Sequence, residues 1–211
     1  MPVSKEELLK AAISRHGEEN QKKFQAATVA ICGLGGLGSN IASSLARIGI
    51  GRLLLIDFDT VDITNLHRQQ YKASQIGKLK TEALKENLYE IAPYIELETY
   101  SERLDENNFA RILANANIIC EAFDDANAKA MLADAVLTQF PDKYLISSSG
   151  MAGFLSANEI KTRKITDKFY LCGDEISDVN AGVGLISSRV MVCAAHQAHM
   201  AVRIIIGERL P

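Results

Sequence analysis

The residues with the clearest capacity for chemistry lie in one polar segment, residues 57–69, which follows a glycine-rich loop at residues 33–38. The loop has the spacing Gly-x-Gly-x-x-Gly between an apolar run and a helical pattern. Glycines at this spacing allow a tight turn and let backbone N–H groups approach a phosphate. Asp57 follows about 20 positions later, where a carboxylate can accept hydrogen bonds from a ribose hydroxyl. The pattern predicts a nucleotide site, and the alternative is a turn that only packs a helix on a strand.

Two cations after Asp57 indicate which nucleotide chemistry to expect. A dinucleotide-binding dehydrogenase usually turns from its second strand directly into a helix, whereas this chain inserts a polar segment that carries Arg68, and Lys80 follows. In adenylate formation a carboxylate attacks the α-phosphate of ATP and pyrophosphate leaves, so fixed cations and Mg²⁺ stabilise the charge that develops. Hydride transfer needs no such cluster. Either cation alone could also be an ordinary surface charge, but the pair favours a triphosphate.

A pair of acidic residues, Asp124 and Asp125, comes directly after the fourth expected strand. Ligands of open α/β sheets bind at the carboxyl ends of the strands. A carboxylate at this position could hold Mg²⁺ against phosphates. Asp124 also suits the N-cap of the helix that follows, and the two roles are compatible.

Composition excludes several other classes of protein. The chain has 211 residues, 47% hydrophobic and 23% charged, with a net charge of −3, which fits one globular domain and gives no basic surface for nucleic acid. Its four cysteines form no C-x-x-C pair, so we expect no zinc. The cysteine usage fits a reducing cytoplasm. Neither a signal peptide nor a membrane span is expected.

The order of apolar runs and helical patterns predicts an α/β fold, with a doubly wound, mostly parallel, Rossmann-like sheet and additional strands near the C-terminus. We expect a single domain over residues 1–211, with an N-terminal helical segment at 1–25 and a polar loop at 177–184. The expected strands are 28–32, 52–56, 95–100, 117–123 and 143–149, with one or two more within 150–174. The expected helices are 5–25, 39–48, 74–91, 105–113 with Asp105 as N-cap, 124–140 and 186–207.

Taken together, these motifs resemble the ThiF/MoeB family, the bacterial branch of the ubiquitin-activating-enzyme-like adenylating proteins. The matching motifs are Gly-x-Gly-Gly-Leu-Gly-Ser, Leu-Ile-Asp-Phe-Asp-x-Val-Asp-x-x-Asn-Leu-x-Arg-Gln, Gly-Lys-Leu-Lys and Phe-Asp-Asp, at 33–39, 55–69, 77–80 and 123–125. The resemblance implies that ATP and Mg²⁺ activate the C-terminal glycine of a ubiquitin-fold sulfur carrier to an acyl-adenylate. A sulfur donor, such as a cysteine desulfurase, then gives the thiocarboxylate. It also implies a homodimer.

The resemblance further assigns roles to individual residues. Asp57 corresponds to the ribose-binding acid and Asp124 to the acid that holds the metal. Arg15 is similar to an arginine that reaches the triphosphate of the neighbouring subunit, and its alternative is an ordinary helix-surface charge. The residues expected at the nucleotide are Gly33, Gly35, Gly36, Gly38, Asp57, Asp59, Asn65, Arg68, Gln69 and Lys80, with Arg68, Lys80, Asp124 and Arg15 as the catalytic set.

The chain departs from the familiar members because the family's two zinc-binding C-x-x-C pairs are absent. This zinc-free form resembles short ThiF-like proteins assigned to thiamine thiazole synthesis, which implies a ThiS-like carrier. Familiar members also place a cysteine in a loop after the adenylation core for sulfur handling. Cys172 is the candidate here, although its acidic neighbours disfavour a thiolate and a structural role is the alternative.

Other functions remain open at this point. The acyl substrate could be a carrier of the molybdopterin type, a small molecule, a peptide or a modified tRNA base. A different class is an NAD-dependent oxidoreductase or a non-catalytic nucleotide-binding module. Asp57 would suit NAD, but the sequence has no obvious His–Asp or Tyr–Lys catalytic pair, and Arg68 and Lys80 argue against it.

Overall fold

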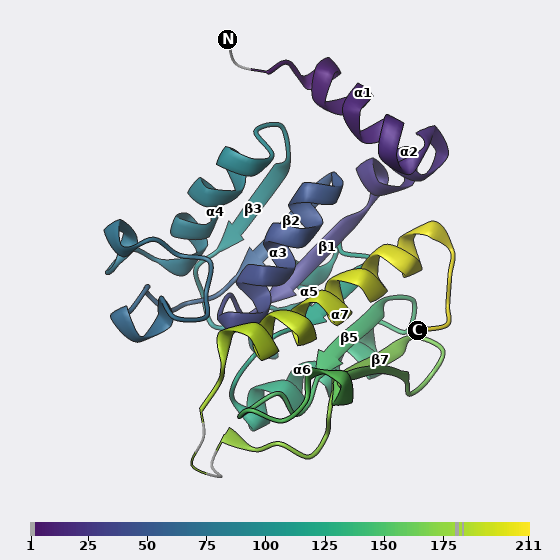
Figure 1. Cartoon of the computed structure of the whole chain (residues 1–211). Coiled ribbons are helices and arrows are strands. Elements are labelled where there is room, and N and C mark those ends of the chain that lie inside the picture. Colours follow the sequence, from purple (N-terminus) through teal and green to yellow (C-terminus); the bar gives the residue numbers. More distant parts are fainter. Residues whose placement is uncertain (1–2, 180–181, 183) are drawn as a thin grey trace.

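The computed structural model describes residues 3–179, 182 and 184–211, and within them the chain forms one seven-stranded sheet in the order β3-β2-β1-β4-β5-β7-β6 (Figure 1). All neighbouring strands pair in parallel except β6 and β7, which are antiparallel. The predicted doubly wound α/β fold with additional C-terminal strands is therefore confirmed. The strands are β1 (Thr28–Cys32), β2 (Arg52–Ile56), β3 (Glu96–Tyr100), β4 (Ile118–Glu121), β5 (Tyr144–Ser148), β6 (Lys161–Lys164) and β7 (Phe169–Gly173).

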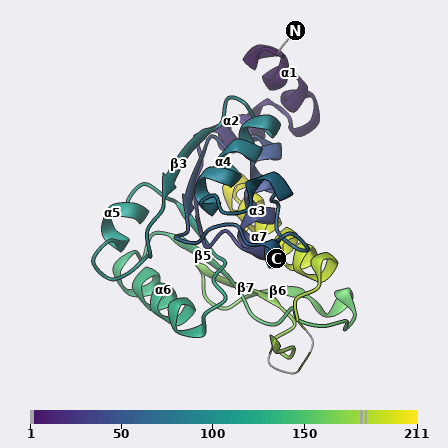
Figure 2. The same cartoon turned by 90° about the vertical axis from the view of Figure 1, so that its left-hand side faces the viewer.

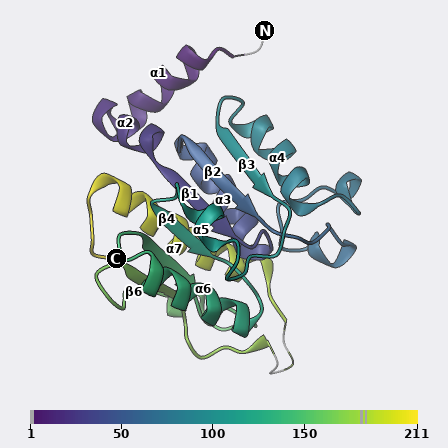
Figure 3. The same cartoon turned by 180° about the vertical axis from the view of Figure 1, so that it is seen from behind.

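Helices cover both faces of the sheet because successive strand residues point to opposite sides. Val29 and Ile31 of β1 belong to one buried cluster, with α3, α4 and α7, whereas Ala30 and Cys32 belong to a second cluster, with α5 and α6. Figures 2 and 3 show these two layers from the side and from behind. The helices are α1 (Lys5–His16), α2 (Glu18–Ala26), α3 (Gly36–Ile48), α4 (Lys80–Ile91), α5 (Phe109–Leu113), α6 (Ala126–Gln139) and α7 (Ser187–Ile206), and the short 3₁₀ turns are η1 (Ile63–Asn65), η2 (Ala73–Gln75) and η3 (Ala157–Glu159).

The order of strands reverses direction between β1 and β4. The chain runs outward from β1 to β2 and β3, then returns to place β4 on the other side of β1. Such a reversal opens a crevice at the carboxyl ends of the two central strands, which is where ligands of these sheets bind. The glycine loop and Asp124 both lie at this edge, since they follow β1 and β4 directly.

Several predicted helix boundaries are wrong. The single helix expected over 5–25 is broken into α1 and α2, because Gly17 has φ +77° and ends the first of them. The helix expected from residue 39 begins at Gly36, inside the glycine loop. The helix expected from 105 begins at Phe109, and the Asp105 carboxylate instead accepts the N–H of Asn107.

Two further helices start later than predicted. The helix expected from 74 begins at Lys80, because the preceding backbone pairs with the segment after β2: Val61 N–H donates to Lys78 O and Lys80 N–H to Asp59 O. The helix expected from 124 begins at Ala126, with Asp125 rather than Asp124 as its N-cap. Residues 180–181 and 183 of the predicted polar loop, and residues 1–2 of the N-terminal segment, lie outside the described residues.

The N-terminal helix α1 stands away from the sheet (Figure 1) and has no buried residue. Its closest tie to the body is formed by α2, whose Phe24 belongs to the core. Over the described ranges, no helix is both long enough and apolar enough to cross a bilayer.

Candidate active site

A cavity of about 490 Å³ lies at the carboxyl ends of β1, β2 and β4, at the point where the strand order reverses. Its walls come from the glycine loop, the segment after β2, the start of α6 and the segments after β5 and β7. All of the residues expected at the nucleotide except Gly38 line it: Gly33, Gly35, Gly36, Asp57, Asp59, Asn65, Arg68, Gln69 and Lys80. The predicted metal-holding Asp124 lines it too.

The glycine loop is held in a fixed tight turn. Gly33 has φ +94°, and a Cβ on Gly38 would lie 1.8 Å from the carbonyl oxygen of Gly33. The Leu34 N–H donates to Asp57 Oδ2 at 2.6 Å, and Tyr71 Oη donates to Leu34 O at 2.7 Å. Gly38 therefore supports the turn from behind, while Gly35 and Gly36 face the cavity.

Asp57 is buried at the end of β2 and also accepts the N–H of Asp59 at 2.8 Å. Burial raises the pKa of Asp57, and the positive charge of Lys80 opposes this shift. A carboxylate has about four acceptor positions, and the bonds from Leu34 and Asp59 use one on each oxygen. Asp57 therefore keeps acceptor capacity for a ligand hydroxyl in the cavity.

The polar segment after β2 is fastened to the first turn of α3. Asn40 Nδ2 donates to Gly36 O at 2.6 Å, and Gln70 Nε2 donates to Asn40 Oδ1 at 2.7 Å. The Gln70 N–H donates to Ser39 Oγ at 3.1 Å. These contacts hold the neighbouring Arg68 and Gln69 beside the glycine loop.

Arg68 and Gln69 line this site, and beside it each has one buried polar atom without a partner in the part of the chain that the structure describes. Within the described residues, Arg68 Nε and Gln69 Oε1 are buried and have no hydrogen-bond partner, and both residues line the cavity. Arg68 Nη1 donates to the backbone oxygen of Thr64 at 3.0 Å. Burial lowers the pKa of Arg68, and the charge of Asp124 opposes that effect. Buried polar groups are normally paired, so these two atoms beside the cavity are exceptions to that rule.

Lys80 and Asp59 form an ion pair at the cavity, with Nζ and Oδ2 2.7 Å apart. The Lys80 side chain is 8% exposed and that of Asp59 is 51% exposed. Lys80 occupies the first position of α4, and the backbone bond from its N–H to Asp59 O fixes both residues. An anionic ligand would compete with Asp59 for this ammonium group.

Asp124 lies exposed at the cavity after β4, and Asp125 beside it caps α6. Across the described ranges, no three His, Cys, Asp or Glu side chains gather into a metal cluster. Mg²⁺ is commonly held by one or two carboxylates together with phosphate oxygens and waters. A single exposed carboxylate next to a phosphate-sized cavity therefore fits Mg²⁺ that arrives with a nucleotide.

Comparison with known proteins gives the family of the chain. The profile of the ThiF family matches residues 9–211. The chain belongs to the ThiF family. The prediction made from the sequence motifs is therefore confirmed at the level of the family.

Several curated relatives of this ThiF-family chain are adenylyltransferases by name. It is 36% identical to the molybdopterin-synthase adenylyltransferase of Haemophilus influenzae over 115 residues, which is 54% of this chain and 47% of the relative. It is 35% identical to the adenylyltransferase and sulfurtransferase UBA4 of Lodderomyces elongisporus over 132 residues, 62% of this chain and 29% of the relative. The matched region thus spans less than half the length of these relatives.

Solved structures show the same fold. The tRNA N6-threonylcarbamoyladenosine dehydratase TcdA of E. coli, in complex with ATP, has a TM-score of 0.83 at 20% identity and covers 98% of this chain and 97% of its own. E. coli MccB with ATP has a TM-score of 0.69 at 23% identity, covering 90% of this chain and 60% of its own. At these identities the likeness is one of architecture.

Besides Gly38, two predicted residues lie outside the cavity of this ThiF-family chain. Arg15 is exposed on α1, so within one chain it does not join the other catalytic candidates. Cys172 lies in β7 with 0% exposure, and burial raises its pKa to about 11, although a hydrogen bond with Thr162 opposes the shift. The expectation of a loop cysteine is wrong, and a buried thiol with a raised pKa does not favour sulfur handling.

A buried charged pair at the end of β4 was not predicted from the sequence. Glu121 at the end of β4 is 0% exposed, and its Oε2 lies 2.9 Å from Nζ of Lys129 in α6. Lys129 lines the cavity and also donates to Ser148 O at 3.2 Å. A glutamate inside the apolar run 118–122 was the available indication, since a buried carboxylate needs a cationic partner.

Proposed function

We propose that this chain is an ATP-dependent adenylyltransferase that activates the C-terminal glycine carboxylate of a ThiS-like, ubiquitin-fold sulfur carrier. The observation that carries the proposal is the meeting of Arg68, Lys80 and Asp124 around one cavity at the switch point of the sheet, with the unpartnered Arg68 Nε and Gln69 Oε1 beside the glycine loop. The adenylyltransferase names of the curated relatives support it.

The residues of the cavity divide the work of nucleotide binding. Backbone N–H groups of the glycine loop and the start of α3 would face the phosphates, and Asp57 would accept a ribose hydroxyl. Asn65, Arg68, Gln69 and Lys80 would contact the triphosphate, with Asp59 adjusting the position of Lys80. Asp124 would hold Mg²⁺, which supplies charge neutralisation at the phosphates when it is bound.

The reaction needs no general base from the protein. The substrate carboxylate is already ionised at neutral pH, so one of its oxygens attacks the α-phosphorus directly. A bond forms between the carboxylate oxygen and the α-phosphorus. The bond between the α-phosphorus and the oxygen that bridges to the β-phosphorus breaks, and pyrophosphate leaves with that oxygen. Arg68 and Lys80 lower the barrier because both cations offset the negative charge that the leaving group gains. A separate sulfur donor would then convert the acyl-adenylate to a thiocarboxylate, for thiamine thiazole synthesis.

The nearest alternative keeps the chemistry and changes the acyl substrate. The Haemophilus influenzae relative is named a molybdopterin-synthase adenylyltransferase, which supports a carrier of the molybdopterin type as the second candidate. An NAD-dependent oxidoreductase is disfavoured, since the cavity presents two cations where hydride transfer would need none.

The proposal is tested by exchange of labelled pyrophosphate into ATP in the presence of carriers ending in Gly-Gly. We expect exchange that depends on a ThiS-like carrier and falls at least about a hundredfold in Asp124→Ala. A matched control is Asp134→Ala, an exposed acid on α6 outside the cavity. Exchange with a molybdopterin-type carrier alone would favour the second candidate, and no exchange with any carrier would refute adenylation of a carrier.

A further inference from the structure

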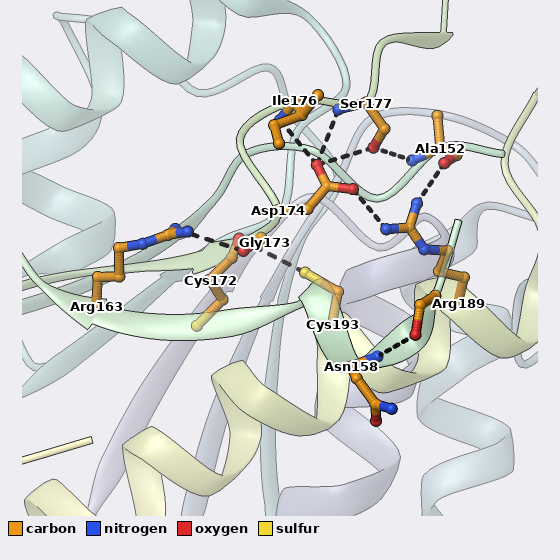
Figure 4. A network of polar contacts seen from close by, with 11 residues as sticks. Ala152, Asn158, Arg163, Cys172, Gly173, Asp174, Ile176, Ser177, Arg189 and Cys193 are labelled. Atoms are coloured by element: carbon orange, nitrogen blue, oxygen red, sulfur yellow. Dashed lines mark hydrogen bonds and ion pairs between the residues drawn. The ribbon is translucent and has the colours of Figure 1, made fainter. Parts of the chain in front are cut away.

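A buried ion pair joins the end of β7 to the start of α7, next to residues that line the cavity (Figure 4). Asp174 follows β7 and Arg189 lies in the first turn of α7, with Asp174 Oδ2 and Arg189 Nη2 2.5 Å apart. Their side chains are 1% and 4% exposed. Neither residue lines the cavity itself. A fully buried ion pair is costly unless further hydrogen bonds satisfy both charges, so its other contacts show what it holds in place.

The pair belongs to a ring of hydrogen bonds that joins three segments of the chain. Asp174 Oδ1 accepts the N–H groups of Ile176 and Ser177, each at 2.9 Å, and Ser177 Oγ at 3.0 Å. Arg189 Nη1 donates to the backbone oxygen of Ala152, and the Ala152 N–H donates to Ser177 Oγ at 2.9 Å. The ring therefore connects the segment after β5, the segment after β7 and the start of α7.

The segment after β5 and the segment after β7 also contact each other through their backbones. The Asp174 N–H donates to Gly150 O at 2.9 Å, and the Glu175 N–H donates to Ser149 O at 3.0 Å. A Cβ on Gly173 would lie 1.8 Å from Ser149 O, so the two backbone segments leave no space for a side chain here. Because both of its oxygens are occupied by these contacts, Asp174 is suited to hold the surrounding segments in place and not to bind a substrate.

The segments that the ring holds form part of the cavity surface. Met151, Ala152, Ser177 and Val179 line it. They lie on the side of β5 and β7, whereas the glycine loop, Asp57 and Arg68 lie on the side of β1, β2 and α3. If the nucleotide occupies the side of β1, β2 and α3, the wall that remains for an acyl substrate is the side of β5 and β7.

We propose that the Asp174–Arg189 pair is a positioning device that fixes residues 150–152 and 177–179 as the acyl-substrate wall of the cavity. The inference rests on the proposed function, because the nucleotide half is assigned there. It makes Asp174 and Arg189 positioning residues that act through the segments they hold. Altering the pair should weaken use of the acyl substrate and leave nucleotide binding intact.

The test compares Arg189→Met and Arg189→Lys with a matched control, Glu175→Gln. Lysine keeps the positive charge but loses the forked geometry that reaches both Asp174 and Ala152. Glu175 is the neighbour of Asp174, and its ion pair with Arg163 is partly exposed and outside the cavity. In carrier-dependent pyrophosphate exchange, we expect KM for the carrier to rise roughly tenfold to a hundredfold in Arg189→Met, and less in Arg189→Lys. The Kd for ATP·Mg measured by calorimetry should stay within about twofold in both variants.

Hydrogen–deuterium exchange of the free protein gives a readout that needs no carrier and keeps the inference separate from the proposed function. Arg189→Lys should speed amide exchange in residues 150–153 and 174–179 and leave residues 34–41 as in the wild type, while Glu175→Gln changes neither. The inference is overturned if Arg189→Lys leaves the two segments unchanged, or if ATP binding weakens as much as carrier use. A wild-type protein inactive with every carrier would refute the proposed function, while the exchange measurement still decides the role of the pair.

Discussion

Arg68 and Lys80 are two cations of the same cavity that differ in whether a carboxylate is paired with them. Lys80 is paired with Asp59, whereas in the described part of the chain Arg68 has no carboxylate within salt-bridge distance and donates to backbone and to His67. A guanidinium that is half-buried without a carboxylate partner has lost solvation that a phosphate could restore. Arg68 is therefore the cation whose removal should alter nucleotide binding most directly.

Asp174 provides a pH-dependent contribution to stability. Burial alone would raise the pKa of Asp174, but the N–H groups of Ser177 and Ile176 and the guanidinium of Arg189 lower it from 3.8 to about 2. Because the folded-state pKa is the lower one, the contribution is fully present above about pH 4 and is lost as the pH falls towards 2. At roughly 1.4 kcal/mol per pKa unit, the contribution is on the order of 2 kcal/mol.

We therefore predict that Asp174→Asn is less stable than wild type at about pH 5, and that the difference shrinks as the pH falls to about 2. Urea unfolding of both proteins over this range measures it. Glu175→Gln serves as the control and should show a difference near zero throughout. A difference between wild type and Asp174→Asn that stays constant with pH would contradict the assignment.

Individual site residues were predictable from sequence to different degrees. Asp57, Arg68, Lys80 and Asp124 could be predicted because each lies in or after a motif with a local spacing. All four line one cavity. Their roles with ATP stay a prediction. The pairs Glu121–Lys129 and Asp174–Arg189 were not predicted. Their members come from different elements, and only the packing of a helix on the sheet brings each acid to its base.

At the scale of elements, the strands were easier to predict than the helix starts. Buried parallel strands appear as short apolar runs, and β1, β2 and β5 lie within their expected ranges. The start of α4 depends on the pairing of residues 59–61 with 77–80, which no local pattern reveals. The break at Gly17 could have been read from the glycine itself, since a glycine with positive φ commonly ends a helix.

The long helix α7 contains a polar residue that the fold leaves unpaired. Gln197 is 0% exposed, and within the described residues neither its Nε2 nor its Oε1 has a hydrogen-bond partner. A buried amide without partners lowers stability by about 1–3 kcal/mol relative to a satisfied or apolar group. Methionine has a similar length and no such requirement.

We predict that Gln197→Met leaves the free energy of unfolding unchanged or raises it by about 1 kcal/mol, measured by urea denaturation. The control is Gln139→Met, at an exposed position at the end of α6, which should change stability by less than about 0.5 kcal/mol. A loss of more than about 1 kcal/mol in Gln197→Met would show that the amide has a partner in solution.

At the scale of the whole molecule, α1 is the helix that contacts the body only near its C-terminal end among the described contacts, where His16 packs on Phe24 of α2. It stands away from the sheet (Figure 1), has no buried residue, and carries the exposed Arg15, which does not line the cavity. The resemblance to the family suggested that this arginine serves the neighbouring subunit of a homodimer. An exposed arm that ends far from its own site is consistent with that proposal.

Hybrid dimers test this arrangement. If each site takes Arg68 from one chain and Arg15 from its partner, Arg15→Ala and Arg68→Ala homodimers should both lose carrier-dependent exchange. A hybrid of the two variants, co-expressed with different tags and purified through both, contains one complete site and should regain about half of the wild-type rate. A hybrid of Arg68→Ala with Arg68→Ala,Arg15→Ala is the control and should stay inactive. A hybrid no more active than its parents would contradict an intersubunit role for Arg15.

The central claim is that the cavity binds a triphosphate, and calorimetric titration with ATP·Mg, AMP and NAD tests it most directly. We predict that the wild type binds ATP·Mg more tightly than AMP and binds NAD most weakly. The reason is that only ATP brings β- and γ-phosphates to Arg68 and Lys80. Arg68→Ala should remove most of the preference for ATP over AMP, whereas Lys72→Ala, an exposed lysine paired with Glu90 outside the cavity, should keep it. Binding of NAD as tight as that of ATP·Mg, or an ATP preference that survives in Arg68→Ala, would contradict the account.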